Sequence, residues 1–165
     1  MLHYRPTEIG ISTPGVIHPS TKILKTSSTL CLNGHPVQKD FSAALNMQVL
    51  LSNDANCFAL GEALLGAARG YNIVLGLIVA TGVGSGIVVG GTLLQGLHGI
   101  AGEWGHNTMY GENAPCHCGK KGCNEMVFSE FALEHFYEEI TGIELSLSEI
   151  HARGACQKVC VLVKT

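Results

Sequence analysis

Three cysteines and one histidine cluster within eighteen residues of this chain, and their spacing is typical of a metal site. Cys116, Cys118 and Cys123 follow the pattern C-x-C-x4-C, and His106 lies ten residues before the first of them. Thiolate and imidazole groups are the usual ligands of zinc in proteins, and four of them complete a tetrahedral site with no open position. A closed coordination sphere cannot activate water. The sequence therefore predicts a structural zinc ion, and other residues must supply the chemistry.

The same cluster has a second interpretation, in which the thiols are ordinary buried side chains without an ion. Gly119 and Gly122 favour the metal, because a chain that bends around an ion needs positive φ angles. Lys120 and Lys121 would partly offset the charge of three thiolates on a divalent ion. His117 is a further candidate ligand, but we expect it to point away because it lies between two of the cysteines.

Three carboxylates are candidates for polar chemistry. Glu103 and Glu125 flank the cysteine and histidine cluster, where a rigid metal loop would hold them against a polar ligand. Asp54 follows Asn53 where an apolar strand ends and a helix begins, which is the ligand-facing edge of an open α/β sheet. An aspartate there also suits a helix N-cap, and the position alone favours that structural role. The two roles of Asp54 stay open at this point.

A glycine-rich segment with the sequence ATGVGSGI runs from Ala80 to Ile87 between two apolar stretches. Glycines at alternate positions let backbone N–H groups turn toward an anion such as phosphate. A tight β-hairpin also uses glycine. The segment lacks the Gly-Lys-Ser/Thr ending of a Walker A loop. It therefore predicts either a phosphate-facing loop or a plain hairpin turn.

Short strands and helices alternate around these residues, which predicts an α/β fold. The expected strands are Glu8–Thr13, Met47–Ser52, Asn72–Ala80, Ile87–Gly91 and a strand-like run at 156–165, with a hairpin over Ile17–Lys25. The expected helices are a short one capped by Asp40, a long one over Ala55–Gly70, another over Glu125–Gly142, and one opened by a capping box at Ser146–Glu149.

The composition excludes several classes of protein. The chain has 165 residues, a net charge of -3 and 14% charged residues. This composition does not favour a basic surface that would bind nucleic acid or an anionic membrane. The longest apolar run is too short to cross a bilayer, and no signal-peptide pattern opens the sequence. Seven cysteines in such a chain are expected to be thiols or metal ligands. We expect a cytoplasmic protein.

Three motifs occur in one order: SNDANCFALGEA, then ATGVGSGIVVGG, then AGEWGHN followed by CHCGKKGCNE. This combination resembles the ROK family (repressors, open reading frames and sugar kinases) of the actin-like ATPase superfamily. Within the family it is most similar to bacterial fructokinases and mannokinases. The resemblance covers Ile9 to Gly142 and implies a partial actin-like ATPase (ribonuclease H-like) fold with a structural zinc loop.

The resemblance implies a role for each matching residue. Asp54 would be the general base that takes the proton from a sugar hydroxyl, and Ser12–Gly15 would line the sugar site. Four side chains would hold the sugar: Asn53, Glu103, His106 and Glu125. The structural Zn²⁺ would have four ligands: His106, Cys116, Cys118 and Cys123. ATP phosphates, bridged by Mg²⁺, would face eight residues: Ala80, Thr81, Gly82, Val83, Gly84, Ser85, Gly86 and Ile87.

The sequence lacks two parts of the family pattern. One is a first strand with an Asp-x-Gly-x-Thr phosphate loop, and the other is a C-terminal lobe that binds adenosine. We therefore expect residues 1–165 to form a single partial ROK kinase domain with the sugar-binding and zinc-loop portion. The leading prediction is ATP-dependent phosphorylation of a fructose-like hexose at its 6-hydroxyl. The resemblance also implies a homodimer.

Two other functions compete with this prediction. One is the sugar-sensing domain of a ROK-type repressor, although no basic helical pair is present and the Asn53-Asp54 pair favours a kinase. The other is a non-catalytic zinc-binding fragment.

Overall fold

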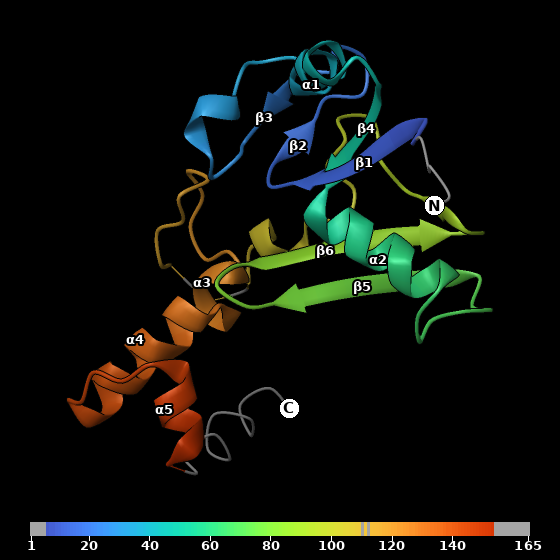
Figure 1. Ribbon diagram of the computed structural model, residues 1–165. Coiled ribbons are helices and arrows are strands. Elements are labelled where there is room, and N and C mark those ends of the chain that lie inside the picture. Colours follow the sequence, from blue (N-terminus) through green and yellow to red (C-terminus); the bar gives the residue numbers. More distant parts are fainter. Residues whose placement is uncertain (1–5, 110, 112, 154–165) are drawn as a thin grey trace, which may run out of the picture. The chain divides into compact units, whose positions relative to one another are not determined.

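The computed structural model describes residues 6–109, 111 and 113–153 of the chain (Figure 1). The chain forms two compact units. The first unit is built from the residues up to Leu77 together with Gly84–Glu103. The second unit is built from Ile78–Val83 and from the chain from Trp104 onward.

The first unit contains a parallel pair of strands, β1 (Glu8–Thr13) and β4 (Gln48–Asn53). Parallel strands need a crossover connection. Here the crossover contains the antiparallel hairpin β2 (Val16–Ile17) and β3 (Leu24–Lys25), the 3-10 turn η1 (Leu30–Leu32) and the helix α1 (Val37–Leu45). The predicted first strand and hairpin are confirmed, and β4 lies one residue further along the chain than predicted.

Asp40 does not cap α1, contrary to the sequence prediction. The helix begins earlier because Pro36 has a fixed φ and supplies the carbonyl that accepts the N–H groups of Lys39 and Asp40. Asp40 therefore lies in the first turn of the helix. The helix ends at Asn46, which takes the left-handed conformation with φ 46°.

The helix α2 (Asp54–Leu64) packs on a sheet with the strand order β5-β6-β7, and Figure 1 shows it lying over β6. The strands are β5 (Ile73–Val79), β6 (Val83–Val89) and β7 (Thr92–Leu93). Ala59 of α2, Val74 of β5 and Val88 of β6 form the buried core of this unit. The helix ends at Leu64, before the predicted Gly70. Just after this end, the Glu62 carboxylate accepts the N–H of Ala67.

The hairpin predicted at the glycine-rich segment is present, because β5 and β6 are neighbours in the sheet, but most of the segment is strand and not turn. Only Ala80–Gly82 connect β5 to β6, and the residues from Val83 onward belong to β6. Gly82, Gly84 and Gly86 do not have positive φ angles. A Cβ on Gly86 would lie 2.9 Å from three atoms of α2, so this glycine serves the close approach of helix and strand.

We expect Gly86→Ala to lower the free energy of unfolding by about 1–3 kcal/mol, because the added methyl group meets the α2 backbone. Gly61→Ala is the matched control, since a Cβ at this position of the same helix has open space around it. The control should raise stability by about 0.5–1 kcal/mol through helix propensity. Urea unfolding measures both changes, and equal effects of the two variants would contradict the close approach.

The second unit contains η2 (Trp104–His106), α3 (Glu125–Phe128), α4 (Glu130–Thr141) and α5 (Leu147–Ala152). The single helix predicted over Glu125–Gly142 is wrong at Ser129, which is extended at φ -68° and ψ 157°. The Ser129 hydroxyl accepts the N–H of Ala132 and so caps α4. Gly142 ends α4 in the left-handed conformation, and Ser146 opens α5 with a capping box, both as predicted.

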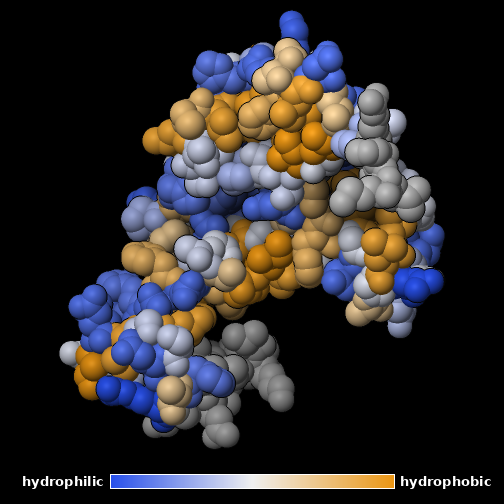
Figure 2. Space-filling model, viewed as in Figure 1, coloured by the Kyte–Doolittle hydropathy of each residue, from blue (hydrophilic) through white to orange (hydrophobic). Residues whose placement is uncertain are grey.

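Apolar side chains of β5 remain at the surface of the described chain. Ile73, Leu75 and Leu77 alternate with buried neighbours, so β5 is not the fully buried strand that was predicted. Figure 2 shows that apolar residues reach the molecular surface in several places. No helix in the described part of the chain has the length and apolar character needed to span a bilayer. The strand-like run predicted at 156–165 lies outside the described residues.

Candidate functional site

A first group of candidate residues, in the first unit, lies where β1 and β4 end together. The parallel register places Thr13 beside Asn53, which brings Ser12–Gly15 next to the start of α2. The side-chain amide of Asn53 donates a hydrogen bond to the Gly15 carbonyl at 3.1 Å. Its side-chain oxygen accepts the N–H of Asn56 at 3.2 Å, so Asn53 is the N-cap of α2.

Asp54 is therefore not the N-cap, and the structural alternative for this residue is wrong. Asp54 is the first residue of α2 and is exposed. Its Oδ1 accepts the N–H of Ala55 at 2.8 Å. Within the described residues no hydrogen bond is formed by Oδ2. The carboxylate is thus held at one oxygen and presents the other at the strand edge, an arrangement that can accept a proton from a bound hydroxyl.

Glu103 belongs to the same unit and precedes η2. Its backbone N–H donates to the carbonyl of Ile100 at 3.2 Å, and its side chain is half-buried. Gly102 before it has φ +90°, and a Cβ there would meet the Ser85 carbonyl at 2.9 Å. The buried Ser85 hydroxyl donates to the Gly102 carbonyl. These contacts tie the segment that carries Glu103 to β6.

A second group of candidate residues, in the second unit, is the predicted metal cluster. The structure brings one ligand atom from each of four residues within 4.8 Å of the others: His106, Cys116, Cys118 and Cys123. The Sγ atoms of Cys118 and Cys123 lie 3.6 Å apart, and His106 Nδ1 lies 3.6 Å from Cys116 Sγ. Tetrahedral zinc with ordinary bond lengths has edges of about 3.8 Å between sulfurs and about 3.6 Å between nitrogen and sulfur. The residues therefore fit a zinc ion, which remains a prediction.

Local backbone geometry positions the cluster. Gly119 and Gly122 have φ angles of +88° and +67°, as the metal interpretation requires. The Cys116 N–H donates to the Lys120 carbonyl at 2.9 Å, which closes the tight turn between the first and last cysteines. Thr108 and Cys123 form an antiparallel bridge that returns the chain to the segment after His106.

Burial is the main influence on the protonation of two members of the cluster, His106 and Cys123. Burial lowers the pKa of His106, which keeps the imidazole neutral at pH 7, as a metal ligand must be. Burial raises the pKa of the Cys123 thiol to about 12. This thiol therefore stays protonated near neutral pH without a cation beside it. Metal binding would release protons from the thiols, so it would be stronger at higher pH.

Glu125 is the first residue of α3 and contacts two other segments. Its Oε2 accepts the N–H of Val83 at 3.0 Å. Its Oε1 lies 3.3 Å from Nδ1 of His117. His117 Nδ1 is also 3.9 Å from Cys116 Sγ, so this ring faces both Glu125 and the cluster, and the expectation that it points away is wrong. Adjacency to two cysteines did not determine its direction.

The predicted phosphate-facing residues divide between the two units. Ala80, Thr81 and Gly82 form a loop in the second unit, and the Thr81 hydroxyl donates to the Glu130 carboxylate at 3.3 Å. The Glu130 N–H donates to the Ala80 carbonyl at 2.8 Å. The remaining residues of the segment lie along β6. Nothing in the sequence pointed to Glu130.

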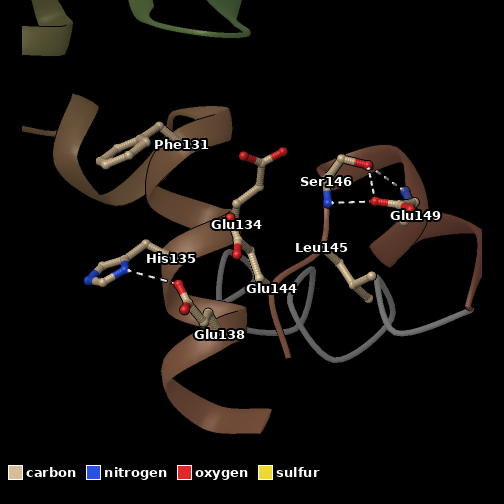
Figure 3. A pocket seen from close by; sticks show the side chains of 8 residues that line it. All are labelled: Phe131, Glu134, His135, Glu138, Glu144, Leu145, Ser146 and Glu149. Carbon is tan, nitrogen blue, oxygen red and sulfur yellow. Dashed lines mark hydrogen bonds and ion pairs between the residues drawn. The ribbon is translucent and has the colours of Figure 1, made fainter. Parts of the chain in front are cut away.

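A pocket that the sequence did not predict lies between α4 and α5 and has a volume of 450 Å³ (Figure 3). Its lining includes four carboxylates: Glu134, Glu138, Glu144 and Glu149. Glu134 accepts the N–H of Leu147, and the Glu149 carboxylate accepts the backbone N–H of Ser146 in the capping box of α5. None of the candidate site residues lines this pocket.

Comparison with known proteins identifies the family of the chain. The ROK family profile matches residues 3–164. The chain belongs to the ROK family. Among curated ROK relatives, the N-acetylgalactosamine kinase AgaK of Shewanella sp. (strain ANA-3) is 39% identical over 142 residues, which are 81% of this chain and 46% of that protein. The N-acetyl-D-glucosamine kinase of Pectobacterium carotovorum subsp. carotovorum (strain PC1) is 37% identical over 92% of this chain and 54% of that protein.

Solved ROK structures confirm the predicted fold class. The ROK hexokinase from Thermus thermophilus has a TM-score of 0.76 at 34% identity, over 88% of this chain and 48% of that one. A ROK glucokinase from Streptomyces griseus, in complex with glucose and AMPPNP, has a TM-score of 0.74 at 28% identity, over 83% of this chain and 44% of that one. A ROK transcriptional regulator homologous to the E. coli MLC protein has a TM-score of 0.77 at 29% identity, over 90% of this chain and 40% of that one.

These neighbours have the α/β actin-like ATPase fold, so this ROK chain has part of that fold. The chain spans about half the length of the curated relatives it matches. The curated relatives above act on N-acetylhexosamines according to their names, and the expected preference for fructose stays a prediction.

Proposed function

We propose that residues 1–165 form the sugar-binding and metal-binding portion of an ATP-dependent sugar kinase, with Asp54 as the general base. The observation that carries the proposal is the arrangement at the end of β4. Asn53 caps α2 and holds Gly15, which leaves the exposed Asp54 carboxylate beside the Ser12–Gly15 segment. The kinases among the relatives and solved structures support the same class of reaction.

Phosphoryl transfer has a loose transition state, so an enzyme catalyses it mainly by positioning and by stabilising charge. We assign Asp54 to orient the sugar hydroxyl and to accept its proton as the bond to phosphorus forms. Asn53, Glu103, His106 and Glu125 are proposed to bind the neighbouring hydroxyls. Ala80–Ile87 are proposed to face the phosphates. When bound, Mg²⁺ would neutralise charge on the phosphates of ATP.

The zinc site is proposed as structural. His106, Cys116, Cys118 and Cys123 would complete four-coordinate zinc, which leaves no position for a substrate. Their role would be to hold the loop that carries His106 and leads to Glu125.

The proposed acceptor is the 6-hydroxyl of a hexose. Fructose is the candidate from the sequence, and the names of the curated relatives add N-acetylglucosamine and N-acetylgalactosamine. A panel of these three sugars with glucose and mannose, assayed by ADP release with Mg²⁺ and ATP, tests the proposal. We expect sugar-dependent and Mg²⁺-dependent ADP release with at least one of them. ADP release with none of the sugars would contradict the kinase activity of this chain.

A second candidate function is the sugar-sensing domain of a ROK repressor. The similarity to the ROK transcriptional regulator favours it, with a TM-score of 0.77. Calorimetric binding of a sugar without any phosphorylation would support this candidate over the kinase. A homodimer and a cytoplasmic location also stay predictions.

A further inference from the structure

We infer that Glu125, in addition to being a candidate sugar ligand, is a positioning residue for the Ala80–Gly82 loop through the N–H of Val83 that follows it. We infer that Glu125 thereby couples sugar binding to phosphate binding. The contact itself stands on the structure alone. The coupling of two substrates rests on the proposed kinase function.

The central contact is between the Glu125 carboxylate and the backbone that follows Gly82. Oε2 accepts the Val83 N–H at 3.0 Å, and the carboxylate is largely buried, with 15% of the side chain exposed. A hydrogen bond from a backbone N–H to a carboxylate is charge-assisted and stronger than one between neutral groups. A Cβ on Gly82 would lie 3.0 Å from the same Oε2. The glycine therefore leaves room for the carboxylate to reach the loop.

A second set of contacts joins the same two segments. The backbone N–H of Glu130 donates to the Ala80 carbonyl at 2.8 Å, and the Thr81 hydroxyl donates to the Glu130 carboxylate at 3.3 Å. Glu125 and Glu130 begin the consecutive helices α3 and α4. Hydrogen bonds thus join the loop to both ends of the six-residue segment Glu125–Glu130, so a shift of the loop would also move that segment.

The remaining oxygen of Glu125 faces the metal loop. Oε1 lies 3.3 Å from His117 Nδ1, and His117 stands between Cys116 and Cys118. Since Oε2 is committed to Val83, Oε1 is the oxygen that can accept a hydrogen bond from a sugar hydroxyl. A sugar on Oε1 would fix the carboxylate that holds Val83. A nucleotide that orders the loop would fix the same carboxylate, and the coupling must be equal in the two directions.

Amide hydrogen exchange at Val83, measured without any ligand, tests the contact independently of activity. Glu125→Ala removes the acceptor, and we expect Val83 exchange to accelerate about tenfold or more, since a hydrogen bond to a charged group is stronger than one between neutral groups. Glu125→Gln keeps a neutral acceptor and should accelerate it less. Glu138→Ala, an exposed glutamate of α4, is the matched control. Val83 exchange equal to that of the control in both Glu125 variants would overturn the inference.

The KM values for sugar and ATP test the coupling. Gly82→Ala pushes against Glu125 Oε2 without removing a sugar ligand, and we expect a several-fold higher KM for the sugar. Glu125→Gln should raise the KM for ATP as well as for the sugar. If Gly82→Ala changes only the KM for ATP and Glu125→Gln only that for the sugar, the coupling is wrong and the kinase proposal stands. If Val83 exchange responds in a chain that phosphorylates no sugar, the kinase proposal fails and the positioning role of Glu125 stands.

Discussion

Asp54→Asn is expected to lower the rate of sugar phosphorylation by about 10²–10⁴-fold, the usual contribution of a general base. The amide cannot accept the proton of the attacking hydroxyl, although it has nearly the same shape. Sugar binding should survive, because Asn53, which holds the Ser12–Gly15 segment, is unchanged. Steady-state ADP release measures the rate, and calorimetry measures the affinity for the sugar.

The structure indicates that this variant will fold. The Oδ1 atom of an asparagine can still accept the Ala55 N–H that Asp54 accepts now at 2.8 Å. The cap of α2 is provided by Asn53 and is not affected. The thermal midpoint should therefore stay close to that of the unaltered protein. Asp40→Asn, a change of the same kind in the first turn of α1, is the control and should keep full activity. Phosphorylation at the unaltered rate by Asp54→Asn would show that another group is the base.

Much of the site could be predicted because its determinants are local. The positive φ angles of Gly119 and Gly122, the capping box at Ser146 and the first strand all follow from short-range chemistry of the backbone. The convergence of His106 on the three cysteines followed from ligand chemistry at short sequence separation. Such features depend on a few neighbouring residues, which the sequence shows directly.

The errors have two physical origins, which are contacts between distant segments and competition between neighbouring residues for a helix cap. Gly84 and Gly86 look like turn residues, but they are extended because α2 lies against β6. Ser129 sits within a sequence of helical periodicity, and its hydroxyl caps a new helix instead. The role of Asp54 could not be decided from a strand–helix boundary, because Asn53 competes for the cap. Glu130 gave no signal, since its partner Thr81 lies forty-nine residues away.

Loss of the predicted zinc ligand Cys123 is expected to have the largest effect on stability. Cys123 is fully buried, and its Sγ lies 3.6 Å from that of Cys118, at a tetrahedral edge of the predicted site. Cys123→Ser should leave the purified protein with far less than the roughly one zinc per chain that we expect for the unaltered protein. Loss of a structural zinc costs several kcal/mol. Since each kcal/mol lowers Tm by about 2–4 °C in a chain of this size, we expect a fall of on the order of 10 °C.

Metal analysis and thermal unfolding measure these changes, and two comparisons separate metal loss from the substitution itself. A chelator added to the unaltered protein should reproduce the fall in Tm, and it should add little to Cys123→Ser. Cys57→Ser is the control, because Cys57 lies in α2 and is not part of the cluster. Unaltered protein that is free of metal and equally stable would contradict the zinc site. Because Glu125 follows Cys123 by two residues and holds the Val83 N–H, metal loss should also accelerate amide exchange at Val83. That result would connect the metal loop to the phosphate-facing loop without any activity measurement.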